Sequence, residues 1–111
     1  MRKMFINGAW SDSPKSSPVI RSFNGETVDH IPDATNEQVE QTLEAAEKAS
    51  KKLAQIPAHE RARILNKAAA LIDEHVDELA NLVSLEVGKP ISEAKGEAGR
   101  VGELLRLSVF E

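Results

Sequence analysis

The spacing of apolar residues changes near residue 34 and divides the chain into two parts. Before this point, the runs "KMFINGAW" and "VIRSFNGETVDHI" each place an Asn-Gly pair between short apolar or β-branched segments. Asn7-Gly8 and Asn24-Gly25 suit a type I′ turn, because both central residues of that turn take positive φ. The pattern predicts two β-hairpins within residues 1–33. Between them, Ser11 to Pro18 contains two prolines and four serines and predicts a loop.

From Asn36 onward, apolar residues recur every three or four positions, which is the period of an α-helix with one buried face. Thr35 and Gln38 form a capping-box pattern, so a helix is expected to begin at this point. Pro57 is expected to end this first helix. The apolar face of the helix comprises Val39, Leu43, Ala46, Ser50 and Leu53.

A second helical stretch runs from Ala58 to Val87, and its polar cluster at residues 73–75 is compatible with either a kink or a break into two helices. Gly88 is expected to end the stretch in the left-handed conformation, and Pro90 to stand in the first turn of the last helix. This last helix stays apolar up to the penultimate residue, whereas helices at chain termini usually fray through polar residues. We therefore expect a truncated chain.

The fold class expected for this chain alone is α+β. Residues 1–33 would form two amino-terminal β-hairpins, and residues 34–111 would form three or four α-helices.

Composition narrows the possible functions. The 111 residues suffice for one domain or part of one, and 18 acidic against 14 basic residues give a net charge of −4. Acidic and basic residues are mixed along the same segments, which argues against a nucleic-acid partner. No apolar run approaches the ~18 residues that span a bilayer, and the start is too polar for a secretory signal, so we expect a cytoplasmic protein without a membrane partner. Cysteine is absent, which excludes disulfides and thiolate chemistry from this chain.

The pair Gly88-Lys89 resembles the end of a phosphate-binding loop. In that motif, however, Val83 stands where the first glycine belongs and Pro90 stands where a metal-binding hydroxyl belongs. The preceding segment is also helical rather than a strand, so the phosphate-loop interpretation is rejected. The three histidines show no metal-ligand spacing, and no catalytic constellation is recognisable.

Three glycines lie at intervals of three residues in the last helix: Gly96, Gly99 and Gly102. Together they cost roughly 2–3 kcal/mol of helix propensity relative to alanine, so something should offset that cost. Either a neighbouring backbone packs closely against them, or a ligand approaches this face. Arg100, in the middle of the face, is either an ordinary exposed arginine or a guanidinium that holds a carboxylate, phosphate or sulfonate through two hydrogen bonds.

The order of the segments "FINGAW", "NGETV", "IPDAT", "LAQIP", "ERARIL" and "LEVGKPISEAKGE" resembles the amino-terminal part of the NAD(P)-dependent aldehyde dehydrogenase superfamily. The resemblance covers essentially the whole chain. It implies part of an α/β fold several times longer, with a Rossmann-like cofactor domain, a catalytic domain and an oligomerisation arm. In this family a cysteine attacks the aldehyde, hydride passes to the nicotinamide, and a glutamate-activated water releases the acid.

The resemblance implies that the catalytic and cofactor motifs lie beyond Glu111. The chain would then contain no catalytic residue, bind neither NAD nor NADP by itself and be inactive alone. Its partners would be a small aldehyde in the full-length enzyme and the remainder of that enzyme or a homo-oligomer. The same resemblance makes four residues of the last helix candidates for the wall of the substrate tunnel, namely Arg100, Leu104, Leu107 and Ser108.

The sequence is most similar to the branch that contains lactaldehyde and non-phosphorylating glyceraldehyde-3-phosphate dehydrogenases. There, Gly-Glu-Val-x-Arg places an arginine where "GEAGR" places Arg100, which makes Arg100 the candidate substrate-binding residue. Glu86 matches an acidic position that in some members helps bind a structural monovalent cation, together with carbonyls here near Val19 and Ile20. The sequence departs from many members of the family at two places. Arg21-Ser22 stands where many members have Asn-Pro, which disfavours the betaine-aldehyde type. Leu107-Ser108 stands where many have paired aromatic residues, which would make the tunnel wall less aromatic.

Two hypotheses follow. The first is the amino-terminal segment of an aldehyde dehydrogenase that oxidises a small, anionic or hydroxylated aldehyde to its carboxylate. The alternative is a stand-alone, non-catalytic helical interaction module derived from such an enzyme.

Overall fold

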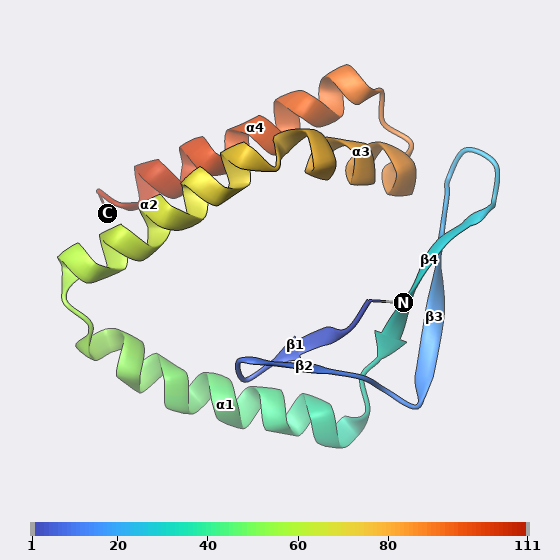
Figure 1. Ribbon diagram of the computed structural model, residues 1–111. Helices are drawn as coiled ribbons and strands as arrows, with labels where there is room; N and C mark the ends of the chain where they lie inside the picture. The colour runs from blue at the N-terminus through green and yellow to red at the C-terminus, as the bar shows by residue number, and fades with distance from the viewer. Residues whose placement is uncertain (1, 111) are drawn as a thin grey trace. The chain divides into compact units, whose positions relative to one another are not determined.

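The computed structural model describes residues 2–110 and divides into two compact units, Met1–Gln55 and Ile56–Glu111. The first is called here the amino-terminal unit and the second the carboxy-terminal unit. The amino-terminal unit contains two antiparallel two-stranded sheets and one helix, and the carboxy-terminal unit contains three helices (Figure 1). These elements confirm the expected α+β class.

The first hairpin pairs β1 (Met4–Ile6) with β2 (Ala9–Ser11). Ile6 faces Ala9 in the register, which leaves Asn7-Gly8 as a two-residue turn. Asn7 has φ 49° and Gly8 has φ 82°, as a type I′ turn requires. The prediction for this turn is confirmed.

The second hairpin pairs β3 (Lys15–Ile20) with β4 (Thr27–Asp33), but its turn differs from the prediction. The Arg21 N–H donates to the Glu26 carbonyl at 2.8 Å, and the Gly25 N–H donates to the Arg21 carbonyl at 2.9 Å. Four residues therefore form the loop, and of these only Gly25 has a positive φ, at 75°. The type I′ prediction for Asn24-Gly25 is wrong, because the Asn24 side chain instead accepts a hydrogen bond from the Glu26 N–H at 3.2 Å.

The expected loop from Ser11 to Pro18 is also wrong in part, because Lys15 to Pro18 belong to β3 and pair with β4. Both strands of a two-stranded sheet are edges, so the missing N–H of a proline breaks no central ladder. The Ser17 hydroxyl donates to the Asp33 carboxylate at 2.8 and 3.0 Å, and Ser13 donates to the Asp33 carbonyl. Two serines of this segment therefore form hydrogen bonds to Asp33, and its prolines are compatible with an edge strand.

Helix α1 (Asn36–Gln55) begins at the predicted capping box. The Thr35 N–H donates to Gln38 Oε1 at 2.9 Å, and the Gln38 N–H donates to Thr35 Oγ1 at 3.2 Å. Gln38 Nε2 also donates to the Asp12 carbonyl at 2.7 Å, which ties the start of α1 to the first hairpin. The apolar face predicted for α1 is not buried: Val39, Leu43 and Leu53 are about half exposed.

In the carboxy-terminal unit, α2 (Ala58–Glu74) and α3 (Val76–Val87) are separate helices. His75 divides them with φ −112° and ψ 13°, so the polar cluster marks a break rather than a kink. Gly88 ends α3 with φ 77°, as predicted, and Pro90 precedes the first residue of α4 (Ile91–Ser108) by one position.

Helix α4 runs back along α3 and α2 and packs against both (Figure 1). The residues of α4 that face the other helices are small, with Ala94, Ala98 and Gly102 buried at intervals of four. Ala80 of α3 belongs to the same cluster, and Val76, Leu79 and Val83 pack around it. Among residues 2–110 no large side chain is fully buried, so this core consists mainly of alanines.

Close packing, one of the two alternatives left open by the sequence, applies to one of the three glycines of α4. A Cβ on Gly102 would meet Asp73 Oδ1 from α2 and would lie 3.2 Å from Arg106 Nη1, so here a neighbour does pack closely. A Cβ on Gly96 or Gly99 would meet no atom within 4 Å. Close packing therefore explains only the third glycine.

We expect Gly102→Ala to be less stable than Gly96→Ala by about 1–2 kcal/mol. Alanine at either position gains helix propensity, but at residue 102 the new methyl group must displace the Asp73 carboxylate from Arg106. Urea unfolding followed by circular dichroism measures both free energies. Equal stabilisation by the two substitutions would show that Gly102 is not required for the approach of the helices.

Candidate functional site

Arg100 lies on the exposed side of α4, beside a surface hollow of about 480 Å³. The side chains that line this hollow are Glu97, Arg100, Val101, Glu103, Leu104 and Leu107. Within residues 2–110, Arg100 forms no ion pair within 4.0 Å. This hollow, called here the α4 hollow, therefore combines an unpaired guanidinium with three apolar side chains.

Three of the four residues expected to form a tunnel wall lie together in the α4 hollow: Arg100, Leu104 and Leu107. Ser108 does not line it, and its hydroxyl donates to the Leu104 carbonyl at 2.9 Å. The tunnel itself stays a prediction, as does the role of Arg100 in binding substrate.

Glu97, which lies three residues before Arg100, was not among the residues predicted for the site. Its carboxylate forms an ion pair with Lys89, the lysine of the Gly-Lys pair. The hydrogen bond from Lys89 and the positive charge of Lys89 lower the pKa of Glu97 from its usual value, and the charge of Arg100 contributes further. The spacing of Glu97 and Arg100 could have indicated this neighbourhood, because residues three apart adjoin on a helix.

The Gly88-Lys89 segment is a helix end, in agreement with the rejection of a phosphate loop. The Gly88 N–H donates to the Ser84 carbonyl at 3.0 Å. The Ser84 hydroxyl donates to the Lys89 carbonyl at 2.8 Å. These two bonds fix the backbone on either side of the Lys89 side chain.

Glu86 lies exposed on α3, and Val19 and Ile20 lie in β3. Among residues 2–110, no group of three or more histidine, cysteine, aspartate and glutamate side chains could hold a metal ion. A monovalent cation bound mainly by carbonyl oxygens needs no such group, so the role of Glu86 stays a prediction.

Two of the three histidines lie at helix boundaries. His75 lies at the helix break, and its Nδ1 is 2.7 Å from the Leu71 carbonyl. His59 is the second residue of α2, at the helix start where the sequence placed it.

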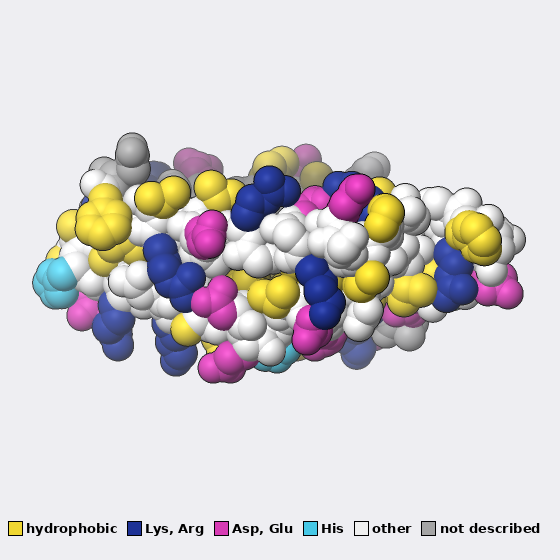
Figure 2. Space-filling model, turned by 90° about the horizontal axis from the view of Figure 1, so that it is seen from above, with side chains coloured by type: hydrophobic (Ala, Val, Ile, Leu, Met, Phe, Trp, Pro, Cys, Tyr) yellow, Lys and Arg dark blue, Asp and Glu magenta, His cyan; other side chains and the backbone are white. Residues whose placement is uncertain are grey.

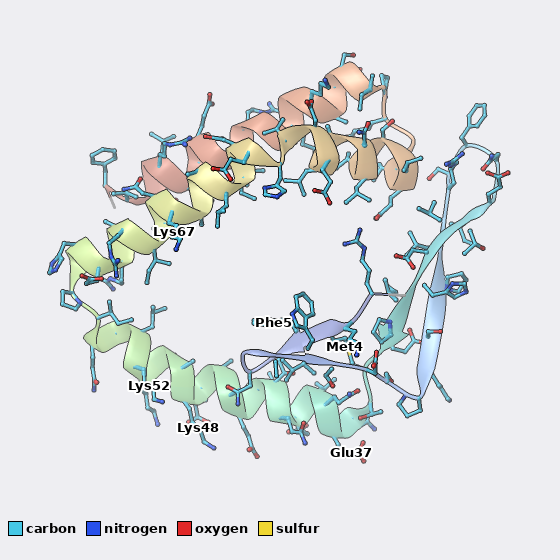
Figure 3. All side chains as sticks on the ribbon, in the orientation of Figure 1. Met4, Phe5, Glu37, Lys48, Lys52 and Lys67 are labelled. Atoms are coloured by element: carbon cyan, nitrogen blue, oxygen red, sulfur yellow. The ribbon has the colours of Figure 1, made fainter. Side chains whose placement is uncertain are left out.

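A second hollow, of about 660 Å³, lies within the amino-terminal unit between the first hairpin and α1. Lys48 and Lys52 extend from the same side of α1 (Figure 3) and line this hollow together with Trp10. Trp10 packs edge-to-face on Phe5 with ring centroids 5.1 Å apart. No polar side chain is buried in this part of the described structure, and Lys48 and Lys52 are exposed.

Comparison with known proteins identifies the class. Residues 10–111 match the model of the aldehyde dehydrogenase family. The chain belongs to this family, which confirms the resemblance drawn from the order of its segments.

Individual members of the family resemble the chain over most of its length. Malonate-semialdehyde dehydrogenase 2 of Oceanobacillus iheyensis is 40% identical over an alignment of 100 residues that covers 88% of this chain and 21% of that protein. An NAD-dependent benzaldehyde dehydrogenase from Corynebacterium glutamicum has a TM-score of 0.90 and 30% identity, and the match covers 96% of this chain and 24% of that chain.

A third relative is the NADP-dependent glyceraldehyde-3-phosphate dehydrogenase from Bacillus halodurans C-125, whose structure was determined with NADP. Its TM-score is 0.95 at 27% identity, over 98% of this chain and 23% of that chain. The chain therefore spans between a fifth and a quarter of the length of these three proteins. None of the described helices combines the length and the hydrophobicity that a membrane span requires.

The Lys89–Glu97 pair predicts a pH dependence of stability. Because the pKa of Glu97 is lowered in the folded chain, the pair stabilises the fold above the unfolded value of about 4.3 and loses this effect as the pH falls through the lowered value. We expect Glu97→Gln to be less stable than the unmodified chain at pH ~7 and equally stable at pH ~2, where the carboxyl is protonated. Urea unfolding at the two pH values measures the difference.

The matched control is Glu97→Gln in the Lys89→Met/Arg100→Ala background, which removes both cations beside Glu97. If these cations are the cause, the effect of Glu97→Gln at neutral pH shrinks in that background. An unchanged effect would assign the stabilisation to another partner.

Proposed function

We propose that this chain acts as the amino-terminal segment of an NAD(P)-dependent aldehyde dehydrogenase that oxidises a small anionic or hydroxylated aldehyde to its carboxylate. The observation that carries the substrate class is the unpaired guanidinium of Arg100 beside the apolar side chains of the α4 hollow. A guanidinium binds a carboxylate or phosphate through two parallel hydrogen bonds, and the apolar neighbours would receive the short carbon chain.

The names of two relatives agree with this substrate class. Malonate semialdehyde carries a carboxylate, and glyceraldehyde 3-phosphate carries a phosphate. The benzaldehyde dehydrogenase acts on an uncharged aromatic aldehyde, and the three leucine and valine side chains beside Arg100 offer no ring for it to stack on. An anionic substrate therefore fits the α4 hollow better.

The covalent step of the family requires a thiolate, and this chain has no cysteine. Its residues also do not fit a dinucleotide site. The strand that leads into a helix, β4, is followed by Ala34-Thr35 instead of a glycine-rich turn. We propose that NAD or NADP and the nucleophile are held by other parts of the enzyme, and that this chain binds and orients the anionic end of the aldehyde.

Exposed apolar side chains support a role as one part of a larger assembly. Leu104, Leu107 and Phe110 are 62%, 64% and 88% exposed in the carboxy-terminal unit. On the face drawn in Figure 2, hydrophobic side chains lie exposed between basic and acidic ones. The remainder of the enzyme, or a further copy in a homo-oligomer, would cover such residues. The location in the cytoplasm stays a prediction.

The same exposed residues would also serve the alternative, a non-catalytic interaction module. The two functions differ in whether the chain can complete an active site. A suitable host is the malonate-semialdehyde dehydrogenase of O. iheyensis, in which this chain replaces the matching 100-residue segment. This protein is called here the hybrid enzyme.

We expect the hybrid enzyme to reduce NAD or NADP when an aldehyde is added, and the 111-residue chain alone to show no such activity. Cofactor absorbance measures both. Oxidation of an aldehyde by the chain alone would contradict its proposed role as a segment. A hybrid that folds and assembles as its host does, yet is inactive with every aldehyde, would favour the interaction module.

The role of Arg100 is tested in the hybrid enzyme with malonate semialdehyde and, as a neutral aldehyde, propanal. Because a charge-assisted pair contributes roughly 1.5–3 kcal/mol, Arg100→Ala should lower kcat/KM for malonate semialdehyde about tenfold to a hundredfold. The value for propanal should change by less than about twofold, because propanal has no anionic group to lose a partner.

The matched control is Arg61→Ala, which removes an exposed arginine from α2 that also forms no ion pair within residues 2–110. It should leave both substrates unaffected. If Arg100→Ala leaves the ratio between the two aldehydes unchanged, Arg100 does not bind the anion.

A further inference from the structure

Arg100 has two acidic neighbours on its own helix, and neither is paired with it. Glu97 lies three residues before it and Glu103 three residues after it, and both line the α4 hollow. A glutamate that precedes its basic partner on a helix forms the more favourable pair. Of these two glutamates, Glu97 is therefore the one that would pair more favourably with the Arg100 guanidinium in place of a substrate anion.

The structure shows that Glu97 is engaged elsewhere. Its Oε2 atom pairs with Lys89 Nζ, and the two side chains are 47% and 41% exposed. The lysine comes from the segment between α3 and α4 and reaches the second turn of α4. Glu97 consequently lies between two cations, with a direct hydrogen bond to Lys89 only.

The position of Lys89 depends on the turn that precedes it. Gly88 adopts the left-handed conformation that ends α3, and Pro90 has φ −56° and ψ 140° directly before α4. With the Ser84 hydroxyl bound to the Lys89 carbonyl at 2.8 Å, the backbone at Lys89 is held on both sides. The turn thus places the Lys89 backbone near Glu97, and the ammonium group reaches the carboxylate from there.

We propose that Lys89 is a positioning residue for substrate selection, which holds the Glu97 carboxylate away from Arg100 and so keeps the guanidinium available for the anionic group of the aldehyde. The inference rests on the proposed function of Arg100 and adds the residue that keeps Arg100 unpaired. Without the lysine, Glu97 would pair with Arg100. It would then compete with the substrate anion for the same N–H donors and also repel it.

The test uses Lys89→Met, which removes the charge and keeps the length of the side chain. In the hybrid enzyme, we expect KM for malonate semialdehyde to rise about threefold to fivefold while kcat stays within about twofold, because an exposed Glu97–Arg100 pair would compete only modestly with the substrate anion. Values for propanal should stay within about twofold of the unmodified hybrid. Lys89→Met/Glu97→Gln should restore the KM for malonate semialdehyde, because the competing carboxylate is then removed.

Lys95→Met is the matched control. Lys95 also lies on α4 and pairs with Asp77 of α3 at 2.8 Å, but it does not line the α4 hollow. It should leave the KM values of both aldehydes unchanged. If Lys89→Met also leaves them unchanged, or if Glu97→Gln fails to restore the double variant, Lys89 does not act through Glu97 and the inference is wrong.

A second measurement separates this inference from the proposed function. In the 111-residue chain, NMR titration of the Glu97 carboxyl carbon and proton exchange at Arg100 Nε report which cation the carboxylate contacts. In Lys89→Met we expect slower exchange at Arg100 Nε, and exchange as fast as in the unmodified chain overturns the inference. If Arg100→Ala fails to alter substrate discrimination while Lys89→Met slows this exchange, the proposed function is wrong although the competition between the side chains is real.

Discussion

The close approach of α4 to α2 and α3 is the constraint on which the carboxy-terminal unit depends. Ala94, Ala98 and Gly102 are buried at this contact, and their small size lets the helix backbones come near one another. With about 100° between successive residues, Arg100 lies about 200° around the helix from Ala98. The packing that buries the alanines therefore also turns Arg100 outward. The core and the candidate site lie on opposite sides of α4.

Ion pairs fix this arrangement further. Lys95 pairs with Asp77 of α3, and Arg106 pairs with Asp73 of α2, beside Gly102. Such partly exposed pairs each contribute little energy. Because Lys95 joins α4 to α3 and Arg106 joins α4 to α2, the two pairs together favour the observed register of α4. The Lys89–Glu97 pair extends this pattern to the start of the helix.

Several features set by local chemistry were predictable from the sequence, although the turn at Asn24-Gly25 was not, because the Asn24 side chain binds the Glu26 N–H. The capping box at Thr35, the turn at Asn7-Gly8 and the helix end at Gly88 each depend on residues within a few positions of one another. The strand at Lys15 to Pro18 was not predictable, because it depends on pairing with β4, which lies farther along the chain. For the same reason the candidate site was predictable only in part. Arg100 was proposed from its motif, and its role stays a prediction, but the ion pair between Lys89 and Glu97 depends on the turn at Gly88 that joins α3 to α4.

The alanine core has a consequence for which changes the unit can tolerate. Most protein cores are damaged when a large side chain is replaced by a small one. Here Ala69, Ala80 and Ala94 have almost no volume to lose, so the harmful changes at the helix contact are those that add atoms. Sequence variation among proteins that keep this contact should therefore be limited at these positions to glycine, alanine and serine, while the exposed leucines of α4 can vary with whatever covers them.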